Sequence, residues 1–171
     1  MAINVKTFKD GLLRLAPLIL LVYICISEFH TQFYLWEIFS FNLQFIIIYY
    51  WILRDPSILG YGFVFICGVM NDVVLSMPMG TSSISYLFVS LVAAYVRNAT
   101  VRSTLFTDWF TFIVAILIGN FITFILIRNF TELEINYTPM FYNSLFTFIL
   151  YPVFWGIFEM YKRAIGLKTY D

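Results

Sequence analysis

Charged residues are scarce in this chain of 171 residues, and their scarcity excludes the commonest class of protein. Asp, Glu, Lys and Arg together make up 12% of the sequence, whereas 61% of the residues are hydrophobic and 21% are aromatic. A soluble globular domain has about 25% charged residues with which to cover its surface. The composition therefore excludes a soluble globular domain and a disordered chain, and it favours an integral membrane domain.

The chain also lacks an excess of positive charge, abundant cysteine and the usual catalytic motifs. Ten Lys and Arg residues balance ten Asp and Glu residues, so nothing favours binding to the phosphates of nucleic acid. Cys25 and Cys67 lie in apolar runs, where we expect them to pack as small hydrophobic side chains. No metalloprotease, nucleophile-elbow or P-loop motif and no Cys/His pair at metal-ligand spacing occurs, so we expect no enzyme, cofactor or metal.

Six apolar stretches, separated by turn residues or charges, predict six transmembrane helices. Runs within them are apolar on every side, as in membrane helices, whereas the strands of a membrane barrel alternate in polarity. About 20 residues cross a bilayer, so the length suits one compact membrane domain. The predicted fold class is an all-α membrane protein, a six-transmembrane-helix bundle that forms a single integral membrane domain over residues 1–171. The predicted spans cover about residues 12–27, 38–53, 61–77, 80–96, 107–127 and 141–161.

The basic residues predict the direction in which these helices cross the membrane. Lys and Arg concentrate in short cytoplasmic loops. With the N-terminus inside, nine of the ten basic residues lie on the inner side and Arg128 alone lies on the outer side. We therefore expect a multi-pass protein with both termini in the cytoplasm. A cleaved signal peptide is the alternative for the first segment, but no A-x-A-like site follows it, so an uncleaved span is favoured.

One acidic residue, Asp72, lies deep within the third predicted span. An ionisable group in hydrocarbon costs about 2.5–3.5 kcal/mol on insertion scales, so Asp72 needs a specific environment. In a helix, Asp72 shares one face with Val64, Gly68 and Ser76, and the two small residues allow a neighbouring helix to approach closely. We therefore expect Asp72 to face another helix rather than lipid.

Three amide side chains from other spans are expected near the depth of Asp72. Asp72 lies about 18 Å and Asn120 about 20 Å along outward-running helices, and Asn42 and Gln44 come within about 9 Å of that depth. We predict that Asp72, Asn42, Gln44 and Asn120 form one buried polar cluster in the outer half of the bundle. Two interpretations stay open, a cluster that only holds helices together and a site that senses or binds something.

Turn residues and charges at the ends of the spans lead to four further expectations. Pro78 and Gly80 are expected to end the third helix, because proline cannot continue it and glycine supplies the turn. Arg54, before Asp55 and Pro56, is expected to reach anionic headgroups on the inner side. Glu159 is expected to pair with Lys162 and Arg163 at the inner end of the last span. Small residues of the fourth span are expected to let partner helices dock closely, and these residues are Ser90, Ala93 and Ala94.

The stretch from Tyr50 to Pro56 and the stretch from Gly68 to Gly80 together resemble the bacterial rod shape-determining protein MreD family. In that family an outward-running span carries a Gly-x-x-x-Asp pattern, followed by a turn that closes on glycine. The matching positions, together with a proline in the last span, are Gly68, Asp72, Pro78, Gly80, Trp51, Pro56 and Pro152.

This resemblance implies a non-catalytic scaffold in the bacterial inner membrane, involved in cell-shape maintenance and lateral peptidoglycan synthesis. It implies partnership with MreC, with the synthase and transpeptidase of the elongation (rod) complex, and with the MreB filament, in contact with membrane lipids. It further implies a helical arrangement similar to the substrate-binding subunit of energy-coupling-factor (ECF) transporters.

Two alternative functions are open from the sequence. The first is the substrate-binding subunit of a vitamin transporter, although such subunits usually carry an Ala-x-x-x-Ala face on the first helix, and here Leu20 follows Ala16 at that spacing. The second is a proton or ion conductor, which requires several intramembrane ionisable residues at relay distance. Asp72 is the one acid that the sequence places deep in a span.

Overall fold

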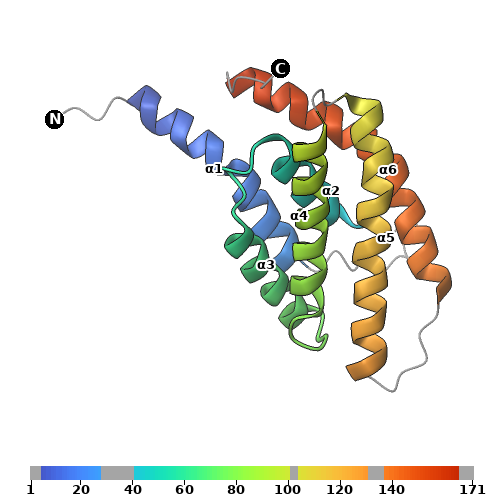
Figure 1. Ribbon diagram of the computed structural model, residues 1–171. Coiled ribbons are helices and arrows are strands. Elements are labelled where there is room, and N and C mark those ends of the chain that lie inside the picture. The colour runs from blue at the N-terminus through green and yellow to red at the C-terminus, as the bar shows by residue number, and fades with distance from the viewer. Residues whose placement is uncertain (1–4, 28–40, 101–103, 131–136, 166–171) are drawn as a thin grey trace.

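The computed structural model describes residues 5–27, 41–100, 104–130 and 137–165, and within these ranges it contains six α-helices and no strands (Figure 1). Each predicted apolar stretch overlaps one helix, so the prediction of an all-α fold is confirmed. The helices are α1 (Val5–Ile26), α2 (Leu43–Arg54), α3 (Tyr61–Val74), α4 (Thr81–Ala99), α5 (Leu105–Phe130) and α6 (Tyr137–Ile165).

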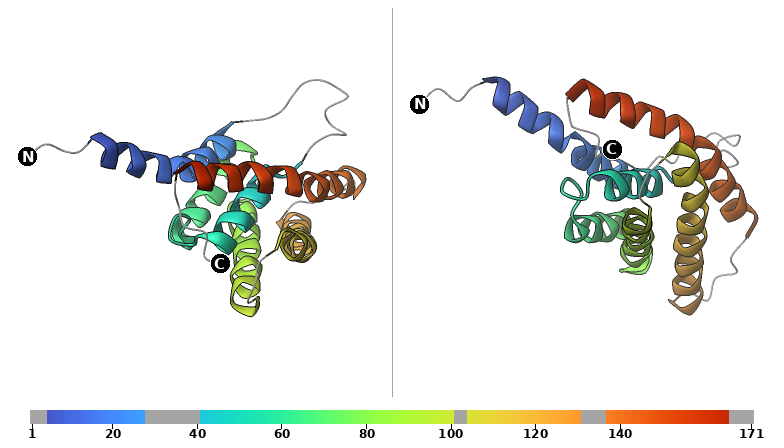
Figure 2. Two further views of the ribbon diagram at one scale, coloured as in Figure 1. Left: turned by 90° about the horizontal axis from the view of Figure 1, so that it is seen from above. Right: turned by 45° about the horizontal axis from the view of Figure 1, so that its top comes forward.

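Helices α3, α4 and α5 form an antiparallel row, with α4 between the other two (Figure 1). Helix α1 packs against α2 and α3, and α6 packs against α5 and α2. The start of α1 and the end of α6 lie toward the same side of the bundle, at the top of Figure 1. Figure 2 shows α6 bending along its length, and Pro152 lies inside this helix.

Helix α2 forms the centre of the bundle. Every residue from Phe45 to Leu53 is buried, including the aromatic side chains of Tyr49, Tyr50 and Trp51. Helices α1, α4, α5 and α6 all contact it, which is why a sequence that is apolar on every side is suitable here. The buried aromatic rings of α2 pack on rings from α5 and α6, such as Tyr49 on Phe112 at a centroid distance of 4.9 Å.

Helices α2 and α3 are shorter than the predicted spans. They have 12 and 14 residues, which correspond to about 18 Å and about 21 Å, less than the roughly 30 Å of a bilayer core. Within the described residues, the helices long and apolar enough to cross a membrane are α5 and the Met140–Ile165 part of α6. The second predicted span begins too early, because α2 starts only after Asn42.

The two cysteines and the small residues of α4 lie in the interior. Cys25 and Cys67 are free and buried, as expected for packing side chains. Ser90 and Ala93 are also fully buried, so they admit helices of the same chain. The expectation that these two residues face partner proteins is therefore wrong.

Candidate functional site

The carboxylate of Asp72 binds the beginning of α4. Asp72 lies in the last turn of α3 with no exposed surface. Its Oδ2 accepts a hydrogen bond from the backbone N–H of Gly80 at 2.8 Å, and its Oδ1 accepts one from the N–H of Ser82 at 2.7 Å. The first N–H groups of a helix have no partner within the helix and carry partial positive charge. Asp72 therefore caps α4 from a neighbouring helix.

The backbone of Asp72 takes part in ending α3. The N–H of Met77 donates to the carbonyl of Asp72 at 2.9 Å, and the N–H of Ser76 donates to the carbonyl of Val73 at 3.3 Å. Ser76 has a φ of 52°, in the left-handed region, so these bonds form a Schellman motif with serine where glycine is usual. Asp72 thus closes one helix with its backbone and opens the next with its side chain.

Pro78 and Gly80 shape the turn, although α3 ends before either residue. The carbonyl of Pro78 accepts the N–H of Thr81 at 3.2 Å and the Thr81 hydroxyl at 2.8 Å. Gly80 adopts a φ of 99°, a conformation that residues with a Cβ rarely adopt. The helix stop itself is the Schellman motif at Ser76, and Pro78 follows it.

Close packing and polar contacts join α3 to α4 beside this cap. A Cβ added to Gly68 would lie 2.6 Å from the backbone nitrogen of Ser83, so only glycine allows this approach. The side-chain amide of Asn71 donates to Ser82 Oγ at 2.9 Å. We call this set of residues the α3–α4 clamp: Gly68, Asn71, Asp72, Gly80, Ser82 and Ser83.

The four residues of the predicted polar cluster have separate environments. The backbone N–H of Asn42 donates to Thr147 Oγ1 at 2.8 Å, and the side chain of Asn120 donates to Ser144 Oγ at 2.6 Å, both on α6. Gln44 lies half-buried in the first turn of α2. Among the described residues no hydrogen bond joins any two of the four. Backbone N–H groups therefore satisfy Asp72, in place of the amides that the sequence suggested.

A second polar site, which the sequence analysis missed, joins α2, α5 and α6. Arg54 Nη2 and Asp108 Oδ2 form an ion pair at 2.7 Å, with side-chain exposures of 9% and 1%. The indole N–H of Trp155 donates to the same carboxylate oxygen at 3.4 Å, and the Arg54 guanidinium lies 5.8 Å from the centre of the Trp155 ring. Arg54 is thus buried in the bundle, and the expectation that it reaches lipid headgroups is wrong.

Glu159 belongs to the same region. The hydroxyl of Tyr50 donates to Glu159 Oε2 at 2.8 Å in the interior, and Lys162 is also buried, within electrostatic range of Glu159. Among the residues that the structure describes, Asp72 is therefore one of three buried acids, with Asp108 and Glu159. We call the following residues the charged network: Tyr50, Arg54, Asp108, Trp155, Glu159 and Lys162.

A sequence signal for the charged network existed, because Asp108 and Arg54 both lie at the predicted inner ends of spans. An acid at that depth needs a cation at the same level.

The remaining positions of the family motif lie in or near α2 and α6. Trp51 is buried in α2, and Pro56 follows Asp55, whose N–H donates to the carbonyl of Trp51 at 2.7 Å.

Two further observations limit the chemistry of these sites. Over the ranges that the structure describes, no group of three or more His, Cys, Asp or Glu side chains could hold a metal ion. The Asp72 and Asp108 carboxylates are each engaged by donors of the protein itself. Both arrangements connect helices.

Comparison of the chain with models of protein families, with curated proteins and with solved structures finds no match.

Proposed function

We propose that the chain is a membrane-embedded bundle whose six helices thread the bilayer, with both termini in the cytoplasm. Large apolar side chains cover its outer surface, which is rare for a soluble monomer. The end of the bundle that holds Arg54, Arg97 and Lys162 is then the cytoplasmic one. Examples of large apolar side chains that are more than half exposed are Ile19, Tyr23, Leu91, Tyr95, Phe110, Leu117, Phe121 and Val153.

The short helix α2 is compatible with this arrangement. A helix needs about 20 residues to cross a bilayer when lipid surrounds it, because its backbone ends must reach water or headgroups. Residues Phe45 to Leu53 contact protein on all sides. Their length therefore need not match the thickness of the hydrocarbon core.

We propose further that the protein is a non-catalytic scaffold of the bacterial elongation complex, of the kind that its resemblance to the MreD family implies. The α3–α4 clamp carries this proposal, because the motif residues Gly68, Asp72 and Gly80 all lie where α3 contacts the beginning of α4. Both oxygens of the Asp72 carboxylate accept backbone hydrogen bonds there, so the motif has a structural role. Such a bundle works through its surface, by holding MreC and the membrane synthase and transpeptidase together and by linking them to the MreB filament.

The vitamin-transporter alternative requires a ligand cavity, with Asp72 at its floor. Asp72 has no exposed surface, and a groove lined by described residues lies elsewhere, between α5 and α6. The scaffold is therefore the better-supported proposal.

Affinity purification of the full chain in mild detergent tests it. We expect MreC and cell-wall synthases to co-purify with the wild-type chain, and recovery of an ATP-driven transport module in their place would contradict the proposal. The Asp72→Leu variant is expected to lose these partners or to impair rod shape in cells. Asp55→Asn, which removes an acid from the α2–α3 turn, is the matched control and is expected to keep them.

A further inference from the structure

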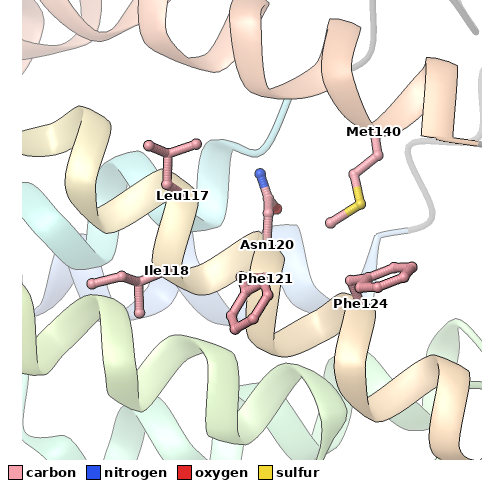
Figure 3. Close-up of a pocket in the computed structure, with 6 residues that line it drawn as sticks. All are labelled: Leu117, Ile118, Asn120, Phe121, Phe124 and Met140. Atoms are coloured by element: carbon pink, nitrogen blue, oxygen red, sulfur yellow. The ribbon is translucent and has the colours of Figure 1, made fainter.

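A groove of about 500 Å³ lies between α5 and α6, in the half of α5 nearest its end at Phe130. Figure 3 shows Met140 reaching from α6 toward α5, on the side where Asn120 and Phe124 lie. Ligand pockets typically have volumes of about 300–1,000 Å³. The residues that line the groove are Leu117, Ile118, Asn120, Phe121, Phe124 and Met140.

The lining is apolar apart from the side-chain amide of Asn120, and that amide already forms a hydrogen bond within the protein. Asn120 Nδ2 donates to Ser144 Oγ at 2.6 Å, and Ser144 Oγ donates to the carbonyl of Met140 at 2.8 Å. The polar groups thus fasten α5 to α6 beside the groove. A ligand here meets mainly the aliphatic and aromatic surfaces of Leu117, Phe121 and the other lining side chains.

A cation lies directly beyond the apolar part of the groove. Arg128 is exposed in the last turn of α5, four residues after Phe124 and therefore on the same face, about 6 Å farther along the helix. Among the described residues at this end of the bundle, Arg128 is the one cation. An apolar groove that leads to a positive charge complements an amphiphile with a hydrocarbon tail and an anionic head.

We propose that this groove binds one acyl chain of a phospholipid, whose phosphate is held by Arg128. The inference rests on the proposed membrane location. Close helix docking requires small residues at the contact, and this groove is walled by Leu117, Phe121, Phe124 and Met140. A thin, flexible acyl chain fits between such side chains, which makes a lipid a better occupant than a partner helix.

Photolabelling of the full chain in nanodiscs tests the proposal. The nanodiscs contain phosphatidylethanolamine and phosphatidylglycerol, with a small fraction of phosphatidylglycerol that carries a photoactivatable acyl chain. Leu91 on α4 is the matched reference, because it is 61% exposed and Phe121 is 63% exposed. We expect labelling at the groove to exceed labelling at Leu91 several-fold.

Arg128→Gln is expected to reduce labelling of the groove about fivefold, the effect of one cation near a lipid surface. Arg163→Gln removes an exposed cation from the last turn of α6 and is expected to leave groove labelling unchanged. If Arg128→Gln unfolds at the same temperature as the wild type, the reduced labelling of the groove reflects the lost cation rather than a less stable fold.

Equal labelling of Phe121 and Leu91, or groove labelling that Arg128→Gln leaves intact, would overturn the proposal. A crosslink in cells from Phe121 to a membrane protein, with no lipid adduct, would assign the groove to a partner helix. A chain that does not incorporate into nanodiscs or cell membranes would instead contradict the proposed membrane location. Failure of the lipid-groove proposal is therefore distinguishable from failure of the proposed membrane location.

Discussion

The indole N–H of Trp109 on α5 donates to the backbone carbonyl of Phe148 on α6 at 2.9 Å. In a regular helix that carbonyl accepts the N–H of residue 152, but residue 152 is proline and has none. The two rings also stack, with centroids 5.0 Å apart. The proline thus frees an acceptor inside α6, and α5 uses it to bind α6.

Trp109→Phe is expected to destabilise the protein by about 1–3 kcal/mol, because it leaves the carbonyl of Phe148 without a donor while an aromatic ring remains. The loss should be smaller when Pro152→Ala is also present, because the backbone of alanine supplies the N–H that proline lacks. Thermal unfolding of both single variants and the double variant in detergent measures the coupling. If the two substitutions change the free energy of unfolding additively, the indole N–H of Trp109 does not replace the backbone N–H that Pro152 lacks.

Asp72→Leu is expected to lower the free energy of unfolding by about 2–6 kcal/mol. It leaves the N–H groups of Gly80 and Ser82 without acceptors, and each unsatisfied donor costs about 1–3 kcal/mol. Asp72→Asn keeps one acceptor oxygen and should lose about half as much. Thermal unfolding of the purified chain measures both variants, with Asp55→Asn in the α2–α3 turn as control. Equal stability of Asp72→Leu and the wild type would contradict the capping role.

Gly68→Ala is expected to cost about 1–3 kcal/mol through overpacking, because the new methyl group meets the backbone of Ser83, which cannot move aside. Gly62 is the matched control. It lies in the same helix with nothing within 4 Å of an added Cβ, so Gly62→Ala should stabilise the helix by about 0.5–1 kcal/mol. The melting temperature is therefore expected to fall for Gly68→Ala and to rise for Gly62→Ala. Shifts of both variants in the same direction would contradict the packing argument.

The sequence predicts the six helices because each apolar stretch is bounded by turn residues or charges. It misplaces the start of α2, since Asn42 stands among apolar residues and is included in the predicted span, whereas it is the residue before the helix. Burial of Asp72 was predictable from its cost in hydrocarbon. The identity of its partners was not, because backbone N–H groups carry no signature in residue types.

The charged network was harder to predict for a different reason. Arg54 and Asp108 are 54 residues apart, and each has an ordinary explanation at the end of a helix. Only the packing of α2 against α5 in the folded chain brings them together. Pairing at a distance in sequence is decided by tertiary structure, which hydrophobic periodicity does not encode.

Replacing one partner of the Arg54–Asp108 ion pair is expected to lower the free energy of unfolding more than replacing both partners with apolar residues. Arg54→Gln alone or Asp108→Asn alone leaves an uncompensated buried charge and should destabilise by about 3–5 kcal/mol. The double variant Arg54→Met with Asp108→Leu should cost clearly less than either single change, because no buried charge remains. Unfolding measured for all three variants, with exposed Arg163→Gln as control, decides the point. A double variant less stable than both singles would contradict it.

Ser76→Gly is expected to stabilise the protein by about 0.5–1 kcal/mol. Ser76 holds a φ of 52° at the end of α3, and this left-handed conformation costs a residue with a side chain about 1–2 kcal/mol but costs glycine nothing. Glycine loses more backbone entropy on folding, about 0.5–1 kcal/mol, which offsets part of this gain. Val73→Gly is the control, because it places glycine inside α3 and should destabilise the protein by roughly 0.3–0.5 kcal/mol, the difference in helix propensity between valine and glycine. Thermal unfolding in detergent compares the two variants with the wild type. Destabilisation by Ser76→Gly would mean that the Schellman motif does not set the end of α3.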